Sequence, residues 1–432
     1  MRLGFVVQRY GTEILGGSEY HCRLIAERLA ERHQVDVLTT CARDYITWKN
    51  EYLDSPDRIR GVTVRRFANA RTRDIASFNR YSEWIFNHAH TRDDELEWLK
   101  QQGPWCPALI EYLERHHAAY DALVFFTYLY APTVLGLQVA PGRSVLVPTA
   151  HDEPAIRLGI YKEVFSRPAA IAYNTEVERK FLTTHFAIRA AIEETVGCGV
   201  DLPQHHAYSR PASGETPPTP EGVTAEAEGG EESRDGGEGQ PRYRSHLTER
   251  GAAFRRRHRI HGPFVLYGGR IEKGKGCEEL LEYFHLYVIG GGEAQLVLMG
   301  VKLMPLPEDP KVNFAGLLSE RERLQALEAA TVVVVPSPFE SLSLLALEAF
   351  AVGTPILANA RSDVLVDHCR RSNAGLFYAE GDEFVECLTL LVADEPLRAA
   401  MGRNGRDYVR RHYRWDVILS KYERMIAKIK GR

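Results

Sequence analysis

Short β-branched or apolar runs alternate with helical stretches along both halves of this 432-residue chain. In the first forty residues the pattern predicts a strand at 3–7, a loop at 10–17, a helix at 19–32 and a second strand at 35–39. Strands joined through a helix run parallel, because the chain must cross over before it can pair again. This order therefore predicts a parallel sheet covered by helices, which is an α/β architecture.

The same alternation continues further along the chain. Further strands are predicted at 122–126, 144–148, 169–173, 264–267, 295–299 and 331–335. A chain of this length is too long for one ordinary core, so we expect two α/β domains. We place the first at residues 1–200 and the second at 251–412, with a linker at 201–250 and a C-terminal helix at 413–432.

Residues 211–240, inside the linker, differ in composition from the rest of the chain. They contain no aromatic residue, 11 Pro or Gly, and 8 acidic residues against 1 basic residue. Such a segment cannot bury enough apolar surface to offset the entropy of ordering, so we expect a disordered acidic insert.

Composition excludes several classes of protein. The formal net charge of −4 gives no overall attraction to nucleic acid. We expect no signal peptide, because the apolar run in MRLGFVVQRY is short and reads as a strand. We expect no membrane span either, because no apolar run approaches the ~20 residues that one needs. The seven cysteines are scattered without a CxxC pair, which predicts reduced thiols in a cytoplasmic protein and no metal site.

Two glutamates stand in the apolar stretch PSPFESLSLLALEAFAVGTP. Glu340 falls in the loop after the strand at 331–335, and Glu348 falls inside the helix predicted at 343–352. Ligands bind at the carboxyl ends of parallel strands, and helix N-termini there suit anions. A carboxylate in an apolar helix needs a partner, either a pair of sugar hydroxyls or an arginine. Alternatively, both glutamates only pair with basic side chains.

A second loop with charged residues follows the strand at 264–267. Its sequence, GGRIEKGKG, supplies Arg270 and Lys275 on a glycine-rich turn that a ligand can approach closely. An arginine fork and a lysine point charge together suit a diphosphate. Basic residues in a surface loop are also common without any such role.

Taken together, GGRIEKGKG and ESLSLLALEAFAVGTPI resemble the motifs of the retaining glycosyltransferases of family 4, which have the GT-B fold. The first domain adds the turn Gly16-Gly-Ser-Glu19, and Val196-Gly-Cys-Gly-Val-Asp201 is similar to the family's hinge motif. The resemblance implies two Rossmann-like domains whose parallel sheets face each other across a cleft. It also implies that the C-terminal helix returns to the first domain.

The resemblance also implies roles for individual residues. Arg270 and Lys275 would hold the donor diphosphate, Glu340 would contact the donor sugar, and the backbone at Ser343 and Leu344 would contact the phosphates. Glu348 would bind the ribose hydroxyls and would have a polar partner only when nucleotide is bound. Gly16 and Gly17 would let the first domain approach the diphosphate. His151, in the sequence HDE, either contacts the donor sugar with support from Asp152 or belongs to a local structural cluster.

The implied function is transfer of a sugar, with retention, from a UDP- or GDP-sugar to a glycan, lipid or metabolite, as in polysaccharide biosynthesis. The resemblance implies no cofactor and no metal. It implies a protein in the cytoplasm or at the inner face of the membrane, where it would contact the membrane peripherally. The sequence departs from the family's motifs at two places: it has Ser341-Leu-Ser343 where the family has Gly-Phe-Gly, and Cys198 where the family has a hinge asparagine. Alternatives are a GT-B nucleotide-sugar 2-epimerase, a non-catalytic nucleotide-sugar-binding protein, and a nucleic-acid binder that uses the basic run at 255–259.

Overall fold

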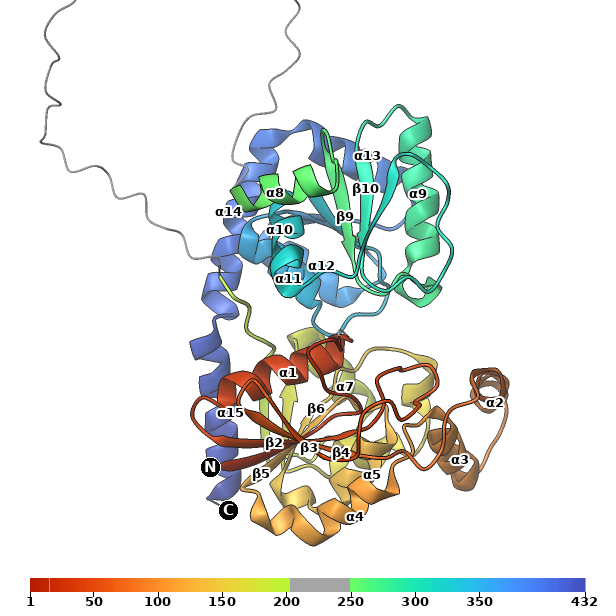
Figure 1. Cartoon of the computed structure of the whole chain (residues 1–432), viewed down its shortest axis with the longest axis vertical. Helices are drawn as coiled ribbons and strands as arrows, with labels where there is room; N and C mark the ends of the chain where they lie inside the picture. Colours follow the sequence, from red (N-terminus) through yellow and green to blue (C-terminus); the bar gives the residue numbers. More distant parts are fainter. Residues whose placement is uncertain (15, 203–248, 432) are drawn as a thin grey trace, which may run out of the picture.

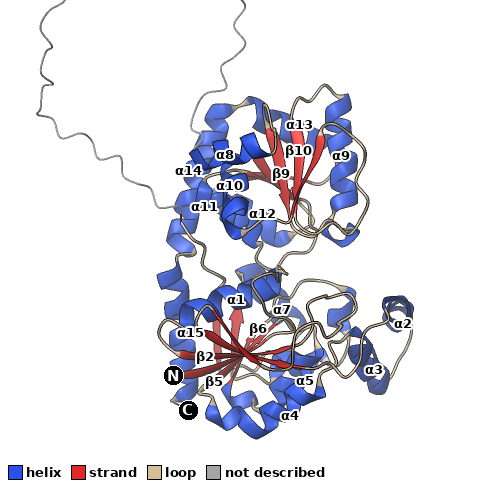
Figure 2. Ribbon diagram, viewed as in Figure 1, coloured by secondary structure: helices blue, strands red, loops and turns tan. Residues whose placement is uncertain are grey.

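The structure is a computed structural model that describes residues 1–14, 16–202 and 249–431. The protein consists of two α/β domains, which lie one above the other in Figure 1, where colour follows the sequence. Each domain has a central sheet with helices packed around it, drawn red and blue in Figure 2. The acidic insert predicted at 211–240, and most of the predicted linker, lie outside the described residues.

The first sheet has the order β3-β4-β2-β1-β5-β6-β7-β8. Its strands are β1 Arg2–Val6, β2 Gln34–Thr40, β3 Pro56–Ile59, β4 Val62–Phe67, β5 Ala122–Phe126, β6 Ser144–Val147, β7 Ala170–Tyr173 and β8 Ile192–Thr195. All neighbours pair in parallel except β3 with β4. The antiparallel edge strand β3 departs from the expected all-parallel sheet. Its exposed residues carry no apolar alternation, so the sequence pattern does not predict it.

Helices cover both faces of the first sheet. They are α1 Gly17–Leu29, α2 Ile75–Asn87, α3 Arg92–Gln102, α4 Pro107–His116, α5 Ala131–Val139, α6 Tyr161–Ser166 and α7 Glu176–His185. The first of these begins two residues earlier and ends three residues earlier than the predicted 19–32. The pair α2 and α3 projects from the side of the domain in Figure 1, and Ile85 is the fully buried residue of α2.

The second sheet has the order β11-β10-β9-β12-β13-β14, and all its neighbours pair in parallel. Its strands are β9 Phe264–Gly268, β10 Gln295–Met299, β11 Val312–Gly316, β12 Val332–Val335, β13 Ile356–Asn359 and β14 Gly375–Tyr378. Its helices are α8 Glu249–Arg257, α9 Cys277–Ile289, α10 Glu320–Ala329, α11 Leu344–Val352, α12 Asp363–Ser372, α13 Gly381–Ala393 and α14 Glu395–His412.

Both sheets contain a point where the strand order reverses direction. In the first sheet β1 lies between β2 and β5, and in the second β9 lies between β10 and β12. The loops at the carboxyl ends of such a strand pair run to opposite faces of the sheet and leave room for a ligand between them. The loops after β1, β5, β9 and β12 are therefore the places where a ligand is expected.

The last helix, α15 Trp415–Lys430, crosses from the second domain back to the first. It packs against α1 and against the strands β5, β7 and β8, and its buried face includes Ile418, Tyr422 and Ile426. Polar contacts also anchor it: among them, Lys421 Nζ donates to the Thr195 carbonyl at 2.7 Å, and Lys430 Nζ lies 3.0 Å from Asp121. The predicted return of this helix is confirmed (Figure 1), and its amphipathic pattern reflects core packing. None of the helices in the described ranges is long and apolar enough to cross a bilayer.

The hinge segment is fixed to the start of α15. The Val200 amide donates to the Tyr413 carbonyl at 3.0 Å, and Trp415 Nε1 donates to Asp201 Oδ1 at 2.9 Å. Gly199 lies against the Trp415 indole, where a Cβ atom would approach a ring carbon to 2.4 Å. The absence of a side chain at this position therefore lets the hinge and α15 pack together.

We expect Gly199→Ala to destabilise the protein by about 1–3 kcal/mol, because the new methyl group overlaps the partly buried ring of Trp415 and forces α15 to shift. The matched control is Gly142→Ala, since a Cβ atom at Gly142 meets nothing within 4 Å. Urea-unfolding midpoints of both variants check this. Equal midpoints for the two variants would contradict the packing argument.

Candidate active site

Arg270, in the loop after β9, lies at the contact between the two domains. Its guanidinium stands over the ring of Tyr45, from the first domain, with the carbon 4.6 Å from the ring centroid. Tyr45 Oη donates to Glu272 Oε2 at 2.8 Å, and Arg270 Nη2 lies 3.1 Å from Glu272 Oε1. Burial opposes the charge of Arg270, but Glu272 and the neighbouring tyrosines outweigh this and raise its pKa. The side chain therefore remains a fixed cation at the interface.

Lys275 and Glu340 come from separate loops and meet in the structure. Lys275 Nζ lies 3.0 Å from Glu340 Oε1. The loops after β9 and β12 approach each other because Gly276 has a positive φ of 74° and lacks a side chain. A Cβ atom at Gly276 would lie 2.3 Å from the Pro336 carbonyl oxygen. Both side chains stay partly exposed, so a ligand can reach the ammonium and the carboxylate together.

The loop after β12 ends in a left-handed residue. Ser343 has φ 60° and forms the N-cap of α11, so the helix begins at Leu344 rather than at Ser343 as predicted. A left-handed backbone conformation is strained for serine but not for glycine. Glycine is the residue at this position in the family whose motifs the sequence resembles. Ser341 contacts the first domain through its Oγ and its carbonyl oxygen, which accept from Asn174 Nδ2 at 3.4 Å and Thr175 Oγ1 at 3.3 Å. No side chain among the described residues caps α11, which leaves its first N–H groups for an anion.

Glu348 is buried and already has one partner. Arg323 Nη2, from α10, donates to Glu348 Oε1 at 2.7 Å. The expectation that Glu348 finds a polar partner only when nucleotide is bound is therefore wrong. Its second oxygen, Oε2, is buried and accepts no hydrogen bond within the described part of the chain. Burial raises the pKa of Glu348, and Arg323 opposes that rise. One carboxylate oxygen thus still needs a hydrogen-bond donor.

In the first domain, Gly16 and Gly17 lie at the start of α1 and differ in what surrounds them. A Cβ atom at Gly16 would lie 2.2 Å from Glu19 Oε2, whereas one at Gly17 would meet nothing within 4 Å. Glu19 is buried and accepts from Arg9 Nε at 2.9 Å and Arg9 Nη2 at 2.7 Å. Burial alone would raise the pKa of Glu19, but Arg9 outweighs it and lowers the pKa. Gly16 makes room for this ion pair, and Gly17 leaves open space at the helix N-terminus.

His151 lies at the domain contact next to the loop that carries Glu340. Its ring stacks on Phe339 at a centroid distance of 5.4 Å. His151 Nε2 lies 3.5 Å from Glu153 Oε1, which also accepts from Tyr128 Oη at 2.5 Å. The predicted support from Asp152 is wrong, because Asp152 pairs with Arg157 at 2.6 Å. Glu153 takes that place instead.

Glu178, at the start of α7, ties two loops of the site together. Its Oε1 accepts from the Ala150 amide at 2.5 Å and its Oε2 from the Asn174 amide at 2.6 Å. The first amide precedes His151, and the second precedes Thr175, the N-cap of α7. Sequence reasoning missed Glu178, although Thr175-x-x-Glu178 has the spacing of a helix capping box. Burial raises the pKa of Glu178 to about 8 despite these hydrogen bonds.

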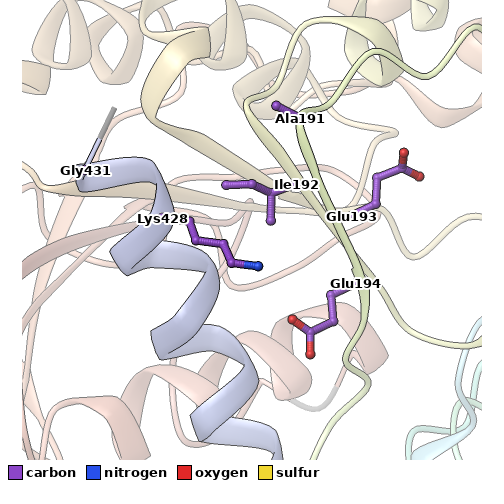
Figure 3. Close-up of a pocket in the computed structure, with 6 residues that line it drawn as sticks. All are labelled: Ala191, Ile192, Glu193, Glu194, Lys428 and Gly431. Atoms are coloured by element: carbon purple, nitrogen blue, oxygen red, sulfur yellow. The ribbon is translucent and has the colours of Figure 1, made fainter.

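A separate hollow of about 450 Å³ lies between β8 and α15. Figure 3 shows its lining, which consists of Ala191, Ile192, Glu193, Glu194, Lys428 and Gly431. None of the predicted site residues lines it. In residues 1–14, 16–202 and 249–431 no three His, Cys, Asp or Glu side chains gather as they would around a metal ion.

Comparison with known proteins identifies the class of the fold. At a TM-score of 0.67 the structure is similar to a sucrose-phosphate synthase from Thermosynechococcus elongatus, with 17% identity over 100% of this chain and 99% of that chain. At a TM-score of 0.65 it is similar to HepE from Anabaena in complex with UDP-glucose, with 14% identity over 99% of this chain and 100% of that one. The predicted GT-B fold is confirmed.

At the level of sequence, residues 252–408 match the family model described as Glycosyl transferases group 1. One relative is a GDP-mannose-dependent monoacylated alpha-(1-6)-phosphatidylinositol monomannoside mannosyltransferase of Corynebacterium glutamicum. The two chains are 24% identical over 170 residues, and this alignment covers 36% of this chain and 45% of that protein. It is 28% identical over 353 residues to a D-inositol 3-phosphate glycosyltransferase of Xylanimonas cellulosilytica, over 78% of this chain and 70% of that protein. The first match thus spans about half the length of that relative.

The raised pKa of Glu178 predicts how stability changes with pH. The folded state binds the proton more tightly than the unfolded state, whose glutamate has the ordinary value of 4.5. This contribution to stability is complete below pH 4.5 and is lost as the pH rises through about 8. Relative to Glu178→Gln, which does not titrate, wild-type protein should lose about 1 kcal/mol or more of unfolding free energy between pH 5 and pH 8.

Urea unfolding at the two pH values measures this difference. The matched control is Glu176→Gln, which changes an exposed carboxylate on the same helix. A wild-type advantage that grows with pH would show that Glu178 is buried as an anion.

Proposed function

We propose that this chain is a retaining GT-B glycosyltransferase of family 4 that uses a nucleoside-diphosphate sugar. One observation carries the proposal: Arg270, Lys275 and Glu340 converge at the carboxyl ends of β9 and β12, against the first domain. These residues lie in the stretch that matches Glycosyl transferases group 1. Two cations beside a carboxylate fit a diphosphate that carries a sugar.

Each residue has a place in this proposal. Arg270 and Lys275 bind the diphosphate oxygens and offset the charge that builds up on the leaving group. The N–H groups at Ser343 and Leu344 add donors at the start of α11, and the open space at Gly17 admits the diphosphate from the first domain. Glu348 Oε2 accepts a ribose hydroxyl, which meets the need of a buried oxygen that lacks a donor among the described residues.

The reaction breaks the bond between the anomeric carbon and a diphosphate oxygen and forms one from that carbon to an acceptor oxygen. The acceptor attacks from the face on which the diphosphate leaves, and its proton passes to the departing phosphate oxygen. Glu340 and His151 lie beside the sugar, where Glu340 stabilises positive charge on the ring. No metal or cofactor enters this scheme.

The donor is a UDP- or GDP-sugar, and both classes occur among the relatives: HepE was solved with UDP-glucose, and the corynebacterial relative is GDP-mannose-dependent. The acceptor is a glycan, lipid or metabolite, read by the first domain. We place the reaction in polysaccharide biosynthesis, in the cytoplasm or at the inner face of the membrane.

Lys275→Ala should lower turnover by about 100-fold or more, because the variant loses a cation that faces the leaving group. The matched control is Lys273→Ala, two positions away, whose ammonium is exposed and pairs with Glu278 at 3.1 Å. Release of nucleoside diphosphate from UDP-glucose and from GDP-mannose measures turnover without a known acceptor. Normal turnover in Lys275→Ala, or equal loss in both variants, would remove the assigned role.

Retention is tested separately by the anomeric configuration of the product. Proton NMR of the sugar released or transferred from an α-linked donor should show the α product first. A β product would leave sugar transfer intact and would contradict the retaining mechanism.

A further inference from the structure

Tyr20 joins the two domains at the contact between α1 and α10. It is 7% exposed, and its Oη accepts from Arg323 Nη2 of the second domain at 2.6 Å. The Arg323 guanidinium carbon lies 4.7 Å from the Tyr20 ring centroid, and that of Arg23 lies 5.2 Å from it. The hydroxyl of a first-domain side chain thus holds a cation of the second domain.

The same nitrogen of Arg323 also serves Glu348. Nη2 donates to Tyr20 Oη and to Glu348 Oε1, and these two bonds use both of its hydrogens. Arg323 Nε is buried and has no partner among the described residues, and the same is true of Glu348 Oε2. An arginine and a carboxylate often form two parallel hydrogen bonds. In such a bidentate pair, Nε and Nη2 of Arg323 would each donate to one oxygen of Glu348. The two unpaired atoms are those that this bidentate pair would join, and the pair is not formed in the arrangement in which Tyr20 Oη binds Nη2.

An outer set of ion pairs fixes α1 against α10 around this contact. Arg23, whose side chain is 1% exposed, reaches Glu27 on its own helix at 3.2 Å and Glu320 on α10 at 2.5 Å. Arg60 lies 3.4 Å from each of the same two carboxylates. The register between Tyr20 and Arg323 is thereby set by charges from both domains.

We propose that Tyr20 and Arg323 form an interdomain latch that couples ribose binding at Glu348 to the closed arrangement of the domains. The inference rests on the proposed function, in which Glu348 receives the ribose hydroxyls. With the domains together, Tyr20 takes one hydrogen of Arg323 Nη2, and Glu348 Oε2 is left for a hydroxyl. With the domains apart, Arg323 pairs with both oxygens of Glu348 and competes with the ribose. Nucleotide therefore binds the closed arrangement more tightly, and by linkage it favours closure.

Tyr20→Phe tests the latch, because it removes the hydroxyl and keeps the ring. Without that acceptor, Arg323 forms the bidentate pair in both arrangements. The dissociation constant for UDP, or for GDP if that is the nucleotide bound, should rise about tenfold, the size of one hydrogen bond to a charged group. The 2′,3′-dideoxy form of the same nucleotide should bind wild type and variant equally, because it offers Glu348 no hydroxyl. Calorimetric titration of the full chain measures both constants.

The matched control is Tyr173→Phe. Tyr173 Oη donates to Glu193 Oε2 at 2.7 Å, and Arg179 lies 6.0 Å from its ring, so a similar trio exists within the first domain alone. This variant should bind both nucleotides as wild type does. A second variant, Arg323→Lys, keeps the charge and cannot form the fork. In that background, Tyr20→Phe should have no further effect on nucleotide binding.

The outcomes separate the latch from the proposed function. If neither UDP nor GDP binds the wild-type chain, both fail. If nucleotide binds and Tyr20→Phe binds it equally well, the latch alone is wrong. Equal weakening of the ordinary and the dideoxy nucleotide would also overturn it, because the tyrosine would then act on closure without Glu348.

Discussion

The packing of α15 on the first sheet is the interaction on which the rest of the arrangement depends. The chain returns to the first domain through α15, and Trp415 at the start of this helix also binds Asp201 in the hinge. Buried side chains on one face of the helix, led by Ile418 and Ile426, supply the apolar area for this attachment. Together with the contacts of Tyr45 with Glu272 and of α1 with α10, this packing fixes the loops after β9 and β12 relative to α1.

Charge organises the region where the domains meet. Each buried carboxylate there has a defined partner: Arg9 for Glu19, Arg323 for Glu348, and backbone amides for Glu178. Buried ion pairs contribute little net stability, because desolvation offsets their attraction. Their place between loops from different strands suggests that they set geometry, and Oε2 of Glu348 has no hydrogen-bond partner among the described residues.

The sequence predicted a large part of the fold because buried parallel strands carry strong local signals. Continuous apolar runs such as Thr331–Val335 and Ala122–Phe126 identify strands without any tertiary information. The edge strand β3 and the exact start of α11 were missed for physical reasons. An exposed edge strand needs no apolar pattern, and Ser343 adopts a left-handed conformation that local propensity disfavours.

The sequence by itself determined the identity of the groups at the candidate site: two cations on a glycine loop, and two glutamates around an apolar helix. It also determined that these lie after strands, because strand and helix periods can be read along the chain. Only the tertiary structure decided which loops meet. That depends on strand order, which places β9 beside β12, and on the close approach at Gly276 that brings Lys275 to Glu340. It also decided that Arg323 and Tyr20 flank Glu348, because contacts between residues 20, 323 and 348 arise only when two domains pack and leave no trace in local spacing.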